Sequence, residues 1–404
     1  MSTQQATAAS TTVAPRPLRA GALGILVVLF VAGLVSLAYA LNSEALQPDF
    51  RLFTVSYLFL MGVSQAGVVF CALTRLVGAQ WAKPYYRLAE LATLAFLPFA
   101  FLGLLLIVYS GKGELFYWLA AAPGEHMSPW LNLGWLVARD LLALLLFYGL
   151  SLFYVITALR PDLSANSTQG QPDHSAVERR LYALSPWVII CFVVCNTLFA
   201  WDFAMMLIPH WHSTVFPIFY WFGNLFAGAA ALTVVPLLLG RSVEGSALFG
   251  PSQLRSLSML LSCFTLMWLY FFWAQFFVMW FGNLPHETGP LWRQMYGHYA
   301  PYYWTMMACC FFAPFAALIF AVFNRSLAAL CLIGLAINLG IWICRYLMVI
   351  PALSPDHTPF DNWVDISLSL GLLAGFLAAV LALASRLPLF SYWEIARTAE
   401  RKHP

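Results

Sequence analysis

"SPWVIICFVVCNTLFAWDFAMMLIPHWHSTVF" (185–216) joins an apolar run that could lie in lipid to a short stretch with ionisable side chains. Asp202 stands inside the hydrophobic segment, and His210 and His212 follow it within ten residues. Ionisable side chains are costly inside a bilayer, and those that occur there usually face the interior of a helix bundle. The segment therefore predicts a membrane-spanning helix with a polar site near one end.

The composition of the 404-residue chain sets its class. Hydrophobic residues make up 62% of it, charged residues make up 9%, and the mean hydropathy is +0.78. Soluble globular domains carry about 25% charged residues, so we expect an all-α integral membrane protein without a separate soluble catalytic domain. The net charge of +3 is spread over many short loops and does not indicate a nucleic-acid partner.

Apolar runs of about 20 residues mark spanning helices, and the chain contains ten of them. They lie at 20–41, 53–77, 88–110, 131–158, 185–207, 216–240, 253–281, 300–323, 326–349 and 363–386. We interpret 20–52 as a retained first helix with its outer loop, not as a signal peptide. The flanking segments 1–19 and 387–404 are expected to be a disordered tail and a second tail, both cytoplasmic.

The basic residues predict the orientation of the chain in the membrane. With the N-terminus on the inner side, fifteen of the twenty Lys and Arg residues lie inside. Arg51, Lys112 and Arg293 lie outside, and Arg139 and Arg345 fall within spans. We therefore expect both termini in the cytoplasm and the segment 201–216 on the outer face.

The histidines and cysteines predict no redox metal in this chain. No histidine lies in the middle of a span, whereas a membrane haem b needs axial histidines on facing helices. All eight cysteines fall in predicted helices, where cysteine is commonly a small buried hydrophobe. His210 and His212 are too few ligands for a zinc site. We expect neither a haem nor an iron–sulfur cluster nor another metal.

Several ionisable residues lie within the predicted spans: Glu90, Arg139, Asp140, Asp202, Arg345 and Asp365. All except Glu90 fall in the outer halves of their helices. Two interpretations remain open: the charges pair and fasten the helices together, or they line a proton path or pocket that opens outward. Asp202 could pair with either Arg139 or Arg345.

The loop histidines and an aromatic helix add a candidate ligand. His210 and His212 suit either an ordinary interfacial loop or a proton-exchanging role. "MWLYFFWAQFFVMWF" (267–281) places Gln275 among aromatic rings. Aromatic faces with a Gln or His hydrogen-bond partner suit a flat, lipid-soluble quinone, although ordinary packing and lipid contact explain the same rings.

Two stretches resemble the NrfD/polysulfide reductase membrane-subunit superfamily: "FAWDFAMMLIPHWHSTVFPIFYWFGNLFAG" (199–228) and "WAQFFVMWFGNLPHET" (273–288). The tail is similar in its order of features, with "NLGIWICRYLMVIPAL" (338–353) followed by "DNWVDISLSLGLLAGF" (361–376). Within the superfamily, the chain looks most like the second NrfD-like subunit of alternative complex III, a bacterial quinol:electron-acceptor oxidoreductase. The "HWHSTVFP" version of the motif is more similar to that of the quinol-binding sister subunit.

The resemblance implies two four-helix bundles, helices 2–5 (53–207) and helices 6–9 (216–349), flanked by helix 1 and helix 10 (361–386). It also implies a bacterial inner-membrane location and several partners. These are an iron–sulfur or molybdopterin-like subunit, multi-haem cytochrome c subunits, a sister NrfD-like subunit and, in some assemblies, a terminal oxidase. The partners would carry the redox metals, so this chain alone is not expected to be an enzyme.

Roles for particular residues follow from the motif and from the buried charges together. Asp202, His212 and Gln275 are the candidate quinone ligands. The candidate proton path comprises Asp202, His210, His212, Arg139, Asp140, Arg345 and Asp365, with Glu90 beginning a second path from the inner side. Two rival functions remain: a secondary transporter, which predicts interrupted helices at matching positions of the two halves, and a purely structural membrane anchor.

Overall fold

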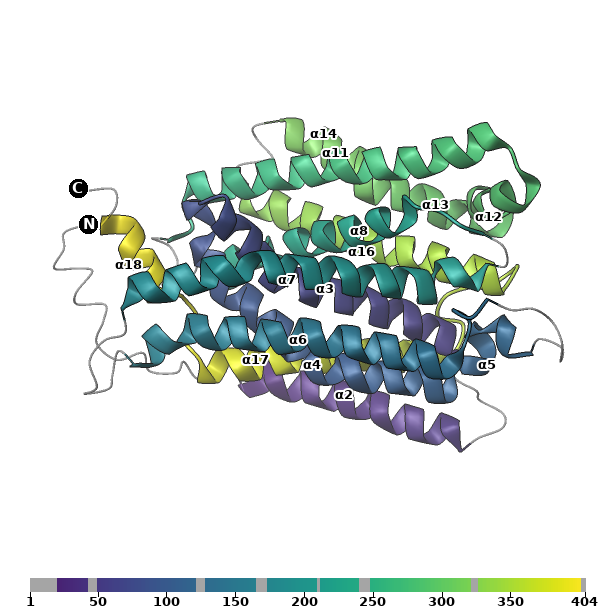
Figure 1. Ribbon diagram of the computed structural model, residues 1–404, viewed down its shortest axis with the longest axis horizontal. Coiled ribbons are helices and arrows are strands. Elements are labelled where there is room, and N and C mark those ends of the chain that lie inside the picture. Colours follow the sequence, from purple (N-terminus) through teal and green to yellow (C-terminus); the bar gives the residue numbers. More distant parts are fainter. Residues whose placement is uncertain are drawn as a thin grey trace.

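The computed structural model describes residues 20–42, 49–120, 128–164, 173–208, 211–239, 248–320 and 326–400. Within these ranges the chain is helical and forms no strand. Ten helices there are long and apolar enough to cross a membrane, which confirms the predicted class of multi-pass, all-α membrane protein. They run side by side along the long axis of the molecule (Figure 1).

The first five spans form one continuous helix each. They are α2 (Ala20–Leu41), α3 (Phe50–Leu76), α4 (Lys83–Ser110, preceded by η1, Gln80–Ala82), α6 (Leu133–Ser164) and α7 (His174–Phe203). Two of the later spans are interrupted. The second group comprises α8 (Phe216–Ala231) with α9 (Val234–Leu239), α11 (Pro251–Gly282), α13 (Ala300–Met307) with the π-helical η5 (Ala308–Phe312) and α14 (Ala313–Ile319), α16 (Leu327–Leu353) and α17 (Trp363–Arg386).

Short helices decorate both ends of the bundle. They are α5 (Lys112–Leu115), η2 (Tyr117–Ala120), η3 (Met205–Leu207), α12 (Pro285–Met295), η4 (Gly297–Tyr299) and α18 (Tyr392–Glu400). α18 lies at the same end as the start of α2, and we call this end the terminal face (Figure 1). The other end, where α5 and α12 lie, is called the distal face.

α7 begins well before the predicted start at residue 185. Asp173 caps the helix by accepting a hydrogen bond from the backbone N–H of Ser175 at 2.8 Å. The additional turns carry the polar segment "HSAVERR" (174–180). A hydropathy pattern marks only the part of a helix that lies in lipid, so the sequence could not place this extension or the polar helices α12 and α18.

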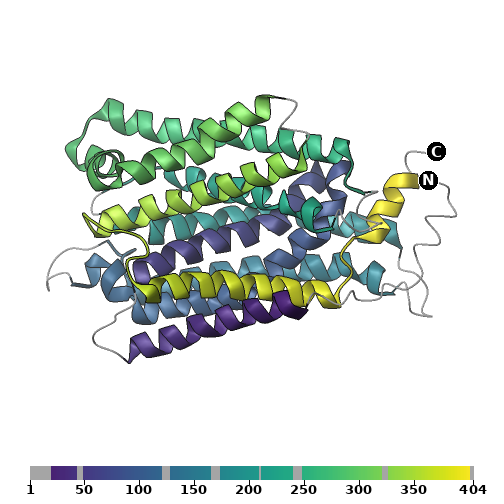
Figure 2. The same ribbon diagram turned by 180° about the vertical axis from the view of Figure 1, so that it is seen from behind.

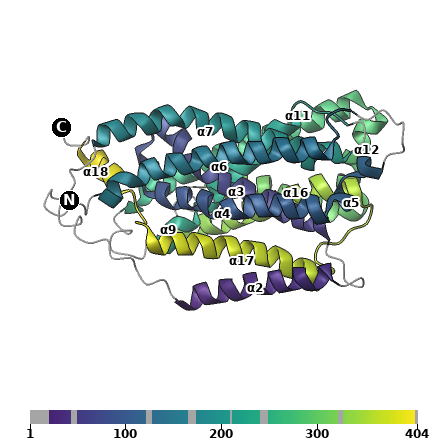
Figure 3. The same ribbon diagram turned by 60° about the horizontal axis from the view of Figure 1, so that its bottom comes forward.

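The spanning helices form two four-helix bundles with a flanking pair. α3, α4, α6 and α7 pack together, and α8, α11, α13–α14 and α16 form the second bundle. α2 packs along α17 beside α4, and Figure 3 shows the pair at the edge of the molecule. Gly33 and Gly371 allow this close pairing, because a Cβ atom at Gly33 would lie 2.9 Å from the Cα atom of Gly371. The residue limits given for the bundles remain a prediction.

α3 joins the two bundles at the centre of the molecule. It packs against α4 and α7 on one side and against α8 and α16 on the other, and Figure 2 shows it in the middle of the helix layers. A Cβ atom at Gly62 would lie 2.2 Å from Oδ1 of Asn224, so the glycine leaves room for that amide between the bundles. The interface is therefore a polar contact as well as an apolar one.

The interrupted helices bear on the transporter alternative. The sixth span is broken between α8 and α9, and the eighth contains the π-helical η5, which ends just before Pro314. Their counterparts in the first bundle, α3 and α6, run unbroken. The described part of the chain therefore lacks the matched interruptions that an inverted-repeat transporter predicts.

Candidate functional site

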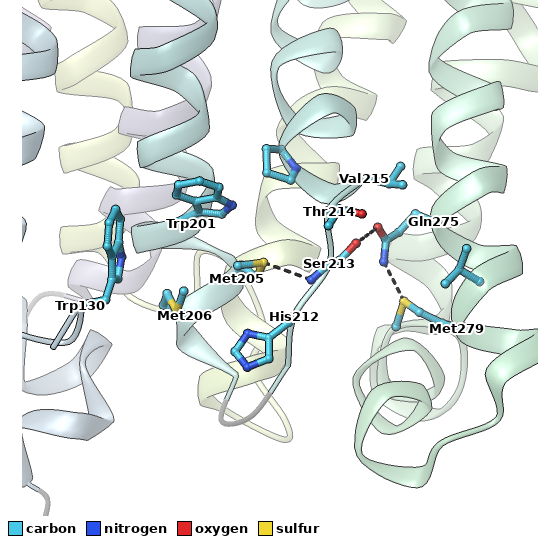
Figure 4. A pocket seen from close by; sticks show the side chains of 12 residues that line it. Trp130, Trp201, Met205, Met206, His212, Ser213, Thr214, Val215, Gln275 and Met279 are labelled. Atoms are coloured by element: carbon cyan, nitrogen blue, oxygen red, sulfur yellow. Dashed lines mark hydrogen bonds between the residues drawn. The ribbon is translucent and has the colours of Figure 1, made fainter. Parts of the chain in front are cut away.

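A cavity of about 630 Å³ opens at the distal face between the two bundles. Figure 4 shows its lining, with Trp130 and Trp201 on one side and Gln275 and Met279 on the other. The lining residues are Trp130, Trp201, Met205, Met206, His212, Ser213, Thr214, Val215, Pro217, Gln275, Val278 and Met279. The cavity is thus mostly apolar and aromatic, with few polar groups, as is typical of small-molecule sites.

Four polar side chains, those of His212, Ser213, Thr214 and Gln275, line this cavity, which we call the distal pocket. His212 is exposed and points into it (Figure 4). Ser213 Oγ donates to Gln275 Oε1 at 2.6 Å and thereby ties the loop after η3 to α11. Gln275 Nε2 lies 3.0 Å from the sulfur atom of Met279. His210 falls outside the described residues, so its predicted place in the site stays a prediction.

Asp202 lies behind the wall of the distal pocket and is not among its lining residues. It stands in the last turn of α7, with its carboxylate buried. Trp130, which does line the pocket, donates from Nε1 to Asp202 Oδ1 at 2.9 Å. The indole ring therefore stands between the cavity and the acid, and its N–H is the direct link between them.

Arg139 on α6 is the ion-pair partner of Asp202. Its Nε atom donates to Asp202 Oδ2 at 2.7 Å, and Nη2 donates to Oδ1. Nη1 donates to the backbone carbonyl of Trp130 at 2.9 Å, and the guanidinium lies 4.0 Å from the centre of the Trp130 ring. This bidentate geometry is the strong form of an Arg–carboxylate pair. Of the two arginines considered from the sequence, Arg139 holds Asp202.

Asp140 adds a second acid to this ion pair. It is fully buried, and its carboxyl group lies beside that of Asp202. Among the residues that the structure describes, no other group donates a hydrogen bond to either of its oxygen atoms. One guanidinium therefore faces two carboxyl groups, and a proton on Asp140 would remove the excess negative charge and supply the missing donor.

A chain of amide side chains crosses from the first bundle to the second. Asn196 Nδ2 donates to Gln65 Oε1, and Asn224 Nδ2 donates to Asn196 Oδ1, each at 2.7 Å. On the first-bundle side, Tyr148 lies within hydrogen-bonding distance of Ser64, at 3.2 Å. These neutral groups are buried and hydrogen-bonded, as buried polar groups require.

Arg345 ends this amide chain on the second-bundle side. Its Nη2 atom donates to Asn224 Oδ1 at 2.8 Å and to the carbonyl oxygen of Tyr220 at 2.6 Å. The guanidinium lies 3.7 Å from the centre of the Tyr220 ring, and its Nε atom lacks a partner. The ion pairs of the described residues do not include Arg345, so this buried cation is held by neutral groups.

Glu90 belongs to a buried charge cluster near the terminal face. Arg87 donates to Glu90 Oε2 at 2.9 Å and to Asp162 Oδ2 at 2.5 Å. Nearby, Arg75 pairs with Glu394 of α18 at 2.6 Å. α18 thus closes the terminal end of the first bundle over these charges.

Asp365 lies in a third group, at the distal end of α17. It accepts a hydrogen bond from the backbone N–H of Asp49 at 2.9 Å. Burial raises the pKa of Asp49, but hydrogen bonds from His357 and Arg51 outweigh it and lower the pKa to about 2. At the neighbouring Glu114, burial and the charge of Asp49 raise the pKa to about 7.

The predicted site residues therefore fall into five places. Arg139, Asp140 and Asp202 lie together, His212 and Gln275 line the distal pocket, and Arg345, Asp365 and Glu90 each lie elsewhere. Arg345 and Asp365 do not join the group around Asp202, because they make their hydrogen bonds with other helices and loops. Sequence reasoning missed Trp130 and Ser213, which are neutral and lie in loops; their only signal was closeness to the motif and to the helix start.

The described residues contain no group of three or more His, Cys, Asp or Glu side chains that could hold a metal ion. The expected lack of redox metals stays a prediction.

The chain is similar to known membrane proteins. The family described as "Polysulphide reductase, NrfD" matches residues 49–354, a range that runs from just before α3 to the end of α16. A protein of Halobacterium salinarum described as a "Putative dimethyl sulfoxide reductase membrane subunit" is 25% identical over 258 residues. The aligned region covers 60% of this chain and 57% of that protein, so the chain spans little more than half of this relative's length.

Proposed function

We propose that this chain, which belongs to the NrfD polysulphide reductase family, binds a quinone or quinol in the distal pocket. The observation that carries the proposal is the pocket itself: a cavity of about 630 Å³ with aromatic walls and a tryptophan that hydrogen-bonds a buried acid behind it. The volume falls within the range of about 300–1,000 Å³ typical of small-molecule sites. Such a chain would be the membrane subunit of a polysulfide or dimethyl sulfoxide reductase-type redox complex.

The lining fits a quinone head group. Trp130 and Trp201 offer ring faces, and the sulfur atoms of Met205 and Met206 offer adaptable apolar contacts. His212 and Ser213 supply hydrogen-bonding groups for carbonyl or hydroxyl oxygens, with Gln275 holding Ser213 in place. Val278 lines the pocket with an exposed side chain, so a quinone tail could leave along the apolar surface of α11 toward the lipid.

Quinol oxidation releases two protons and two electrons, and the electrons would pass to a metal centre of a partner subunit. This chain would handle the protons. His212 could accept one at a ring nitrogen, since a neutral imidazole has one nitrogen that accepts a hydrogen bond. Asp140 could hold one on its carboxyl group, where no other donor satisfies the oxygens, whereas Asp202 is occupied by Arg139 and Trp130.

We further propose that the first bundle conducts protons between its two charge clusters. Tyr148, Ser64 and Gln65 lie buried between Asp140 and the cluster around Glu90, and hydroxyl groups can both donate and accept. The Arg87–Glu90 ion pair lies at one end of this route. Breaking and re-forming this pair would switch proton conduction on and off. With the basic residues inside, the terminal face would be cytoplasmic and both termini would lie there, in a bacterial inner membrane.

The finer assignment is a role in an alternative complex III-like quinol oxidoreductase. It rests on the resemblance of the motif in 199–228. Partners there would be iron–sulfur, cytochrome c and sister membrane subunits. Co-purification of the chain in mild detergent distinguishes this from a reductase complex: a multi-haem cytochrome supports the former, and a molybdopterin subunit without one contradicts it.

Pocket variants test the quinone proposal. His212→Gln replaces a hydrogen-bonding group of the pocket, and Gln275→Leu removes the bond that holds Ser213 in place. Each variant should raise the KM for quinol about tenfold, which corresponds to the loss of about one hydrogen bond to the ligand. His298→Gln is the matched control, since His298 lies at the distal face outside the pocket. Equal quinol kinetics in the pocket variants and the wild-type complex would contradict the proposal and favour a purely structural anchor.

A further inference from the structure

A second cavity, of about 420 Å³, lies at the terminal face beneath α18. The end of α3, the start of α4, the first turns of α7 and the side chain of Arg397 from α18 form its walls. It lies at the opposite end of the molecule from the distal pocket. The proposed quinone chemistry makes no use of it.

The charges around this cavity are unbalanced toward positive. Arg75, Lys83, Arg179 and Arg397 line it, and Glu178 is the lining acid. Glu394 adds one more carboxylate, which binds Arg75 at 2.6 Å. Among the described residues, the four cations around the cavity thus face these two acids and Asp173, whose carboxylate interacts with Arg179. Arginine side chains suit the planar, multidentate recognition of a phosphate group, and lysine binds phosphate as a point charge.

Neighbouring groups hold the two arginines that flank the mouth of the cavity. Ser175, in the first turn of α7, donates its hydroxyl group to Asp173 Oδ1 at 2.6 Å and accepts a hydrogen bond from Arg179 Nη1 at 3.3 Å. Arg397 pairs with Glu178 and also donates to the carbonyl oxygen of His174 at 3.1 Å. Arg397 is therefore held over the cavity by two contacts, while the Arg179 side chain is exposed at its mouth.

The surface next to the cavity is apolar. Tyr182 lines the cavity and is exposed, and the exposed face of α7 continues with Trp187, Ile190 and Val194 toward the middle of the membrane. These residues recur at helical spacing on one face. A charged cavity at the end of a spanning helix, continued by an exposed apolar stripe, matches a phosphate group with attached acyl chains better than a free anion.

We infer that this cavity binds the phosphate of an anionic phospholipid, with Arg179 and Arg397 as ligands and the acyl chains along α7. Basic pockets between spanning helices bind anionic head groups in this way, and each Lys or Arg near the surface contributes about 1 kcal/mol. The site would anchor α18 to the membrane surface as well as to the protein.

The test compares two double variants of the intact complex. Arg179→Gln with Arg397→Gln removes two cavity cations, whereas Arg180→Gln with Arg386→Gln removes two exposed cations from the same face outside the cavity. Native mass spectrometry would follow titration with phosphatidylglycerol, phosphatidylcholine and inorganic phosphate. The cavity variant should lose about 25-fold in affinity for phosphatidylglycerol, fivefold per cation, and the control about twofold or less.

Three results would overturn the inference. One is an equal loss in the two double variants, which would reduce the effect to general surface charge. Another is phosphatidylcholine binding as tightly as phosphatidylglycerol. The third is saturable binding of inorganic phosphate that phosphatidylglycerol does not displace, which would identify a free anion as the ligand. Unchanged melting temperatures of both variants ensure that the loss is not one of folding.

Discussion

Arg139 in the first bundle and Arg345 in the second are buried in nearly the same surroundings. Each guanidinium stacks on an aromatic ring, Trp130 or Tyr220, and donates to the backbone carbonyl of that same residue. They differ in the third partner, which is the carboxylate of Asp202 for Arg139 and the amide of Asn224 for Arg345.

This difference shows that a buried arginine can lie in a site with surplus carboxyl groups or in a site with surplus positive charge. At Arg139 two carboxyl groups face one cation, so the site has room for a proton. At Arg345 one cation faces neutral groups, so a proton arriving there would meet uncompensated positive charge. A buried arginine therefore does not by itself mark a proton site; the balance of its neighbours decides.

Removing Arg139 should give the largest effect. Arg139→Met leaves Asp202 and Asp140 buried without a cation, and breaking a buried pair in this way costs about 3–5 kcal/mol. We expect little assembled protein and a strongly lowered melting temperature in detergent. Adding Asp202→Asn to Arg139→Met should recover part of the lost stability, which a double-mutant cycle measures. If Arg139→Met alone melts at the wild-type temperature, the difference between the two arginines does not hold.

Removing Arg345 should cost less. Arg345→Met leaves only neutral acceptors without a donor, namely Asn224 Oδ1 and the Tyr220 carbonyl oxygen, at about 2 kcal/mol. The thermal melting of this variant, measured beside that of Arg139→Met, sharpens the comparison. If both variants lose the same stability, Arg345 must face an anion after all.

Trp130→Phe tests the link between pocket and acid. The ring remains for Arg139 to stack on, but the Nε1–H donor to Asp202 is gone, which should cost about 1 kcal/mol of stability. Quinol-dependent turnover per assembled complex should fall. Trp201→Phe is the control, since Trp201 lines the same pocket; an equal fall in both variants would mean that the indole N–H has no special role.

The smallest effect concerns the distal loops and depends on pH. Because burial and the charge of Asp49 raise the pKa of Glu114 from 4.5 to about 7, its contribution to stability is full below pH 4.5 and is lost as the pH rises through 7. The melting temperature of the wild-type protein should fall across this range relative to that of Glu114→Gln, by about 2 °C.

Asp49→Asn is the control for Glu114→Gln and has the opposite sign. The pKa of Asp49 is lowered from 3.8 to about 2, so its stabilisation is present above pH 3.8 and is lost only toward pH 2. Asp49→Asn should therefore lower the melting temperature between pH 4.5 and 7. Because the charge of Asp49 raises the pKa of Glu114, this variant should also show a smaller fall of the melting temperature as the pH rises. If the melting temperature of Glu114→Gln depends on pH as that of the wild-type protein does, while that of Asp49→Asn does not, then Glu114 is not the group that causes the pH dependence.

The sequence predicts the number of spans and a buried acid at Asp202 because both depend on single physical rules. Length and hydropathy mark helices that cross lipid, and a charge inside one is costly enough to be noticed. The partners were harder to predict. Asn224 and Trp130 are neutral and carry no signal along the chain, and Arg87, which the sequence assigns to an inner loop, is fully buried against Glu90.

The depth of a charge along its own helix could be predicted, but the direction in which it points could not. Arg345 and Asp202 both fall in the distal halves of their helices, yet they lie in different bundles with different neighbours. Only the packing of α3 between the bundles, with Gly62 making room for Asn224, determines which polar groups meet.

The pairing of Arg75 with Glu394 joins positions 319 residues apart. During synthesis the arginine enters the membrane with the second span, long before its carboxylate exists. Its place near the end of α3 lets the cation remain in head-group water throughout translation. The contact can form only after the tenth span has been inserted, so α18 covers the terminal face in the last step of biogenesis. Intermediates that lack α18 should therefore be cleaved by proteases at the terminal face.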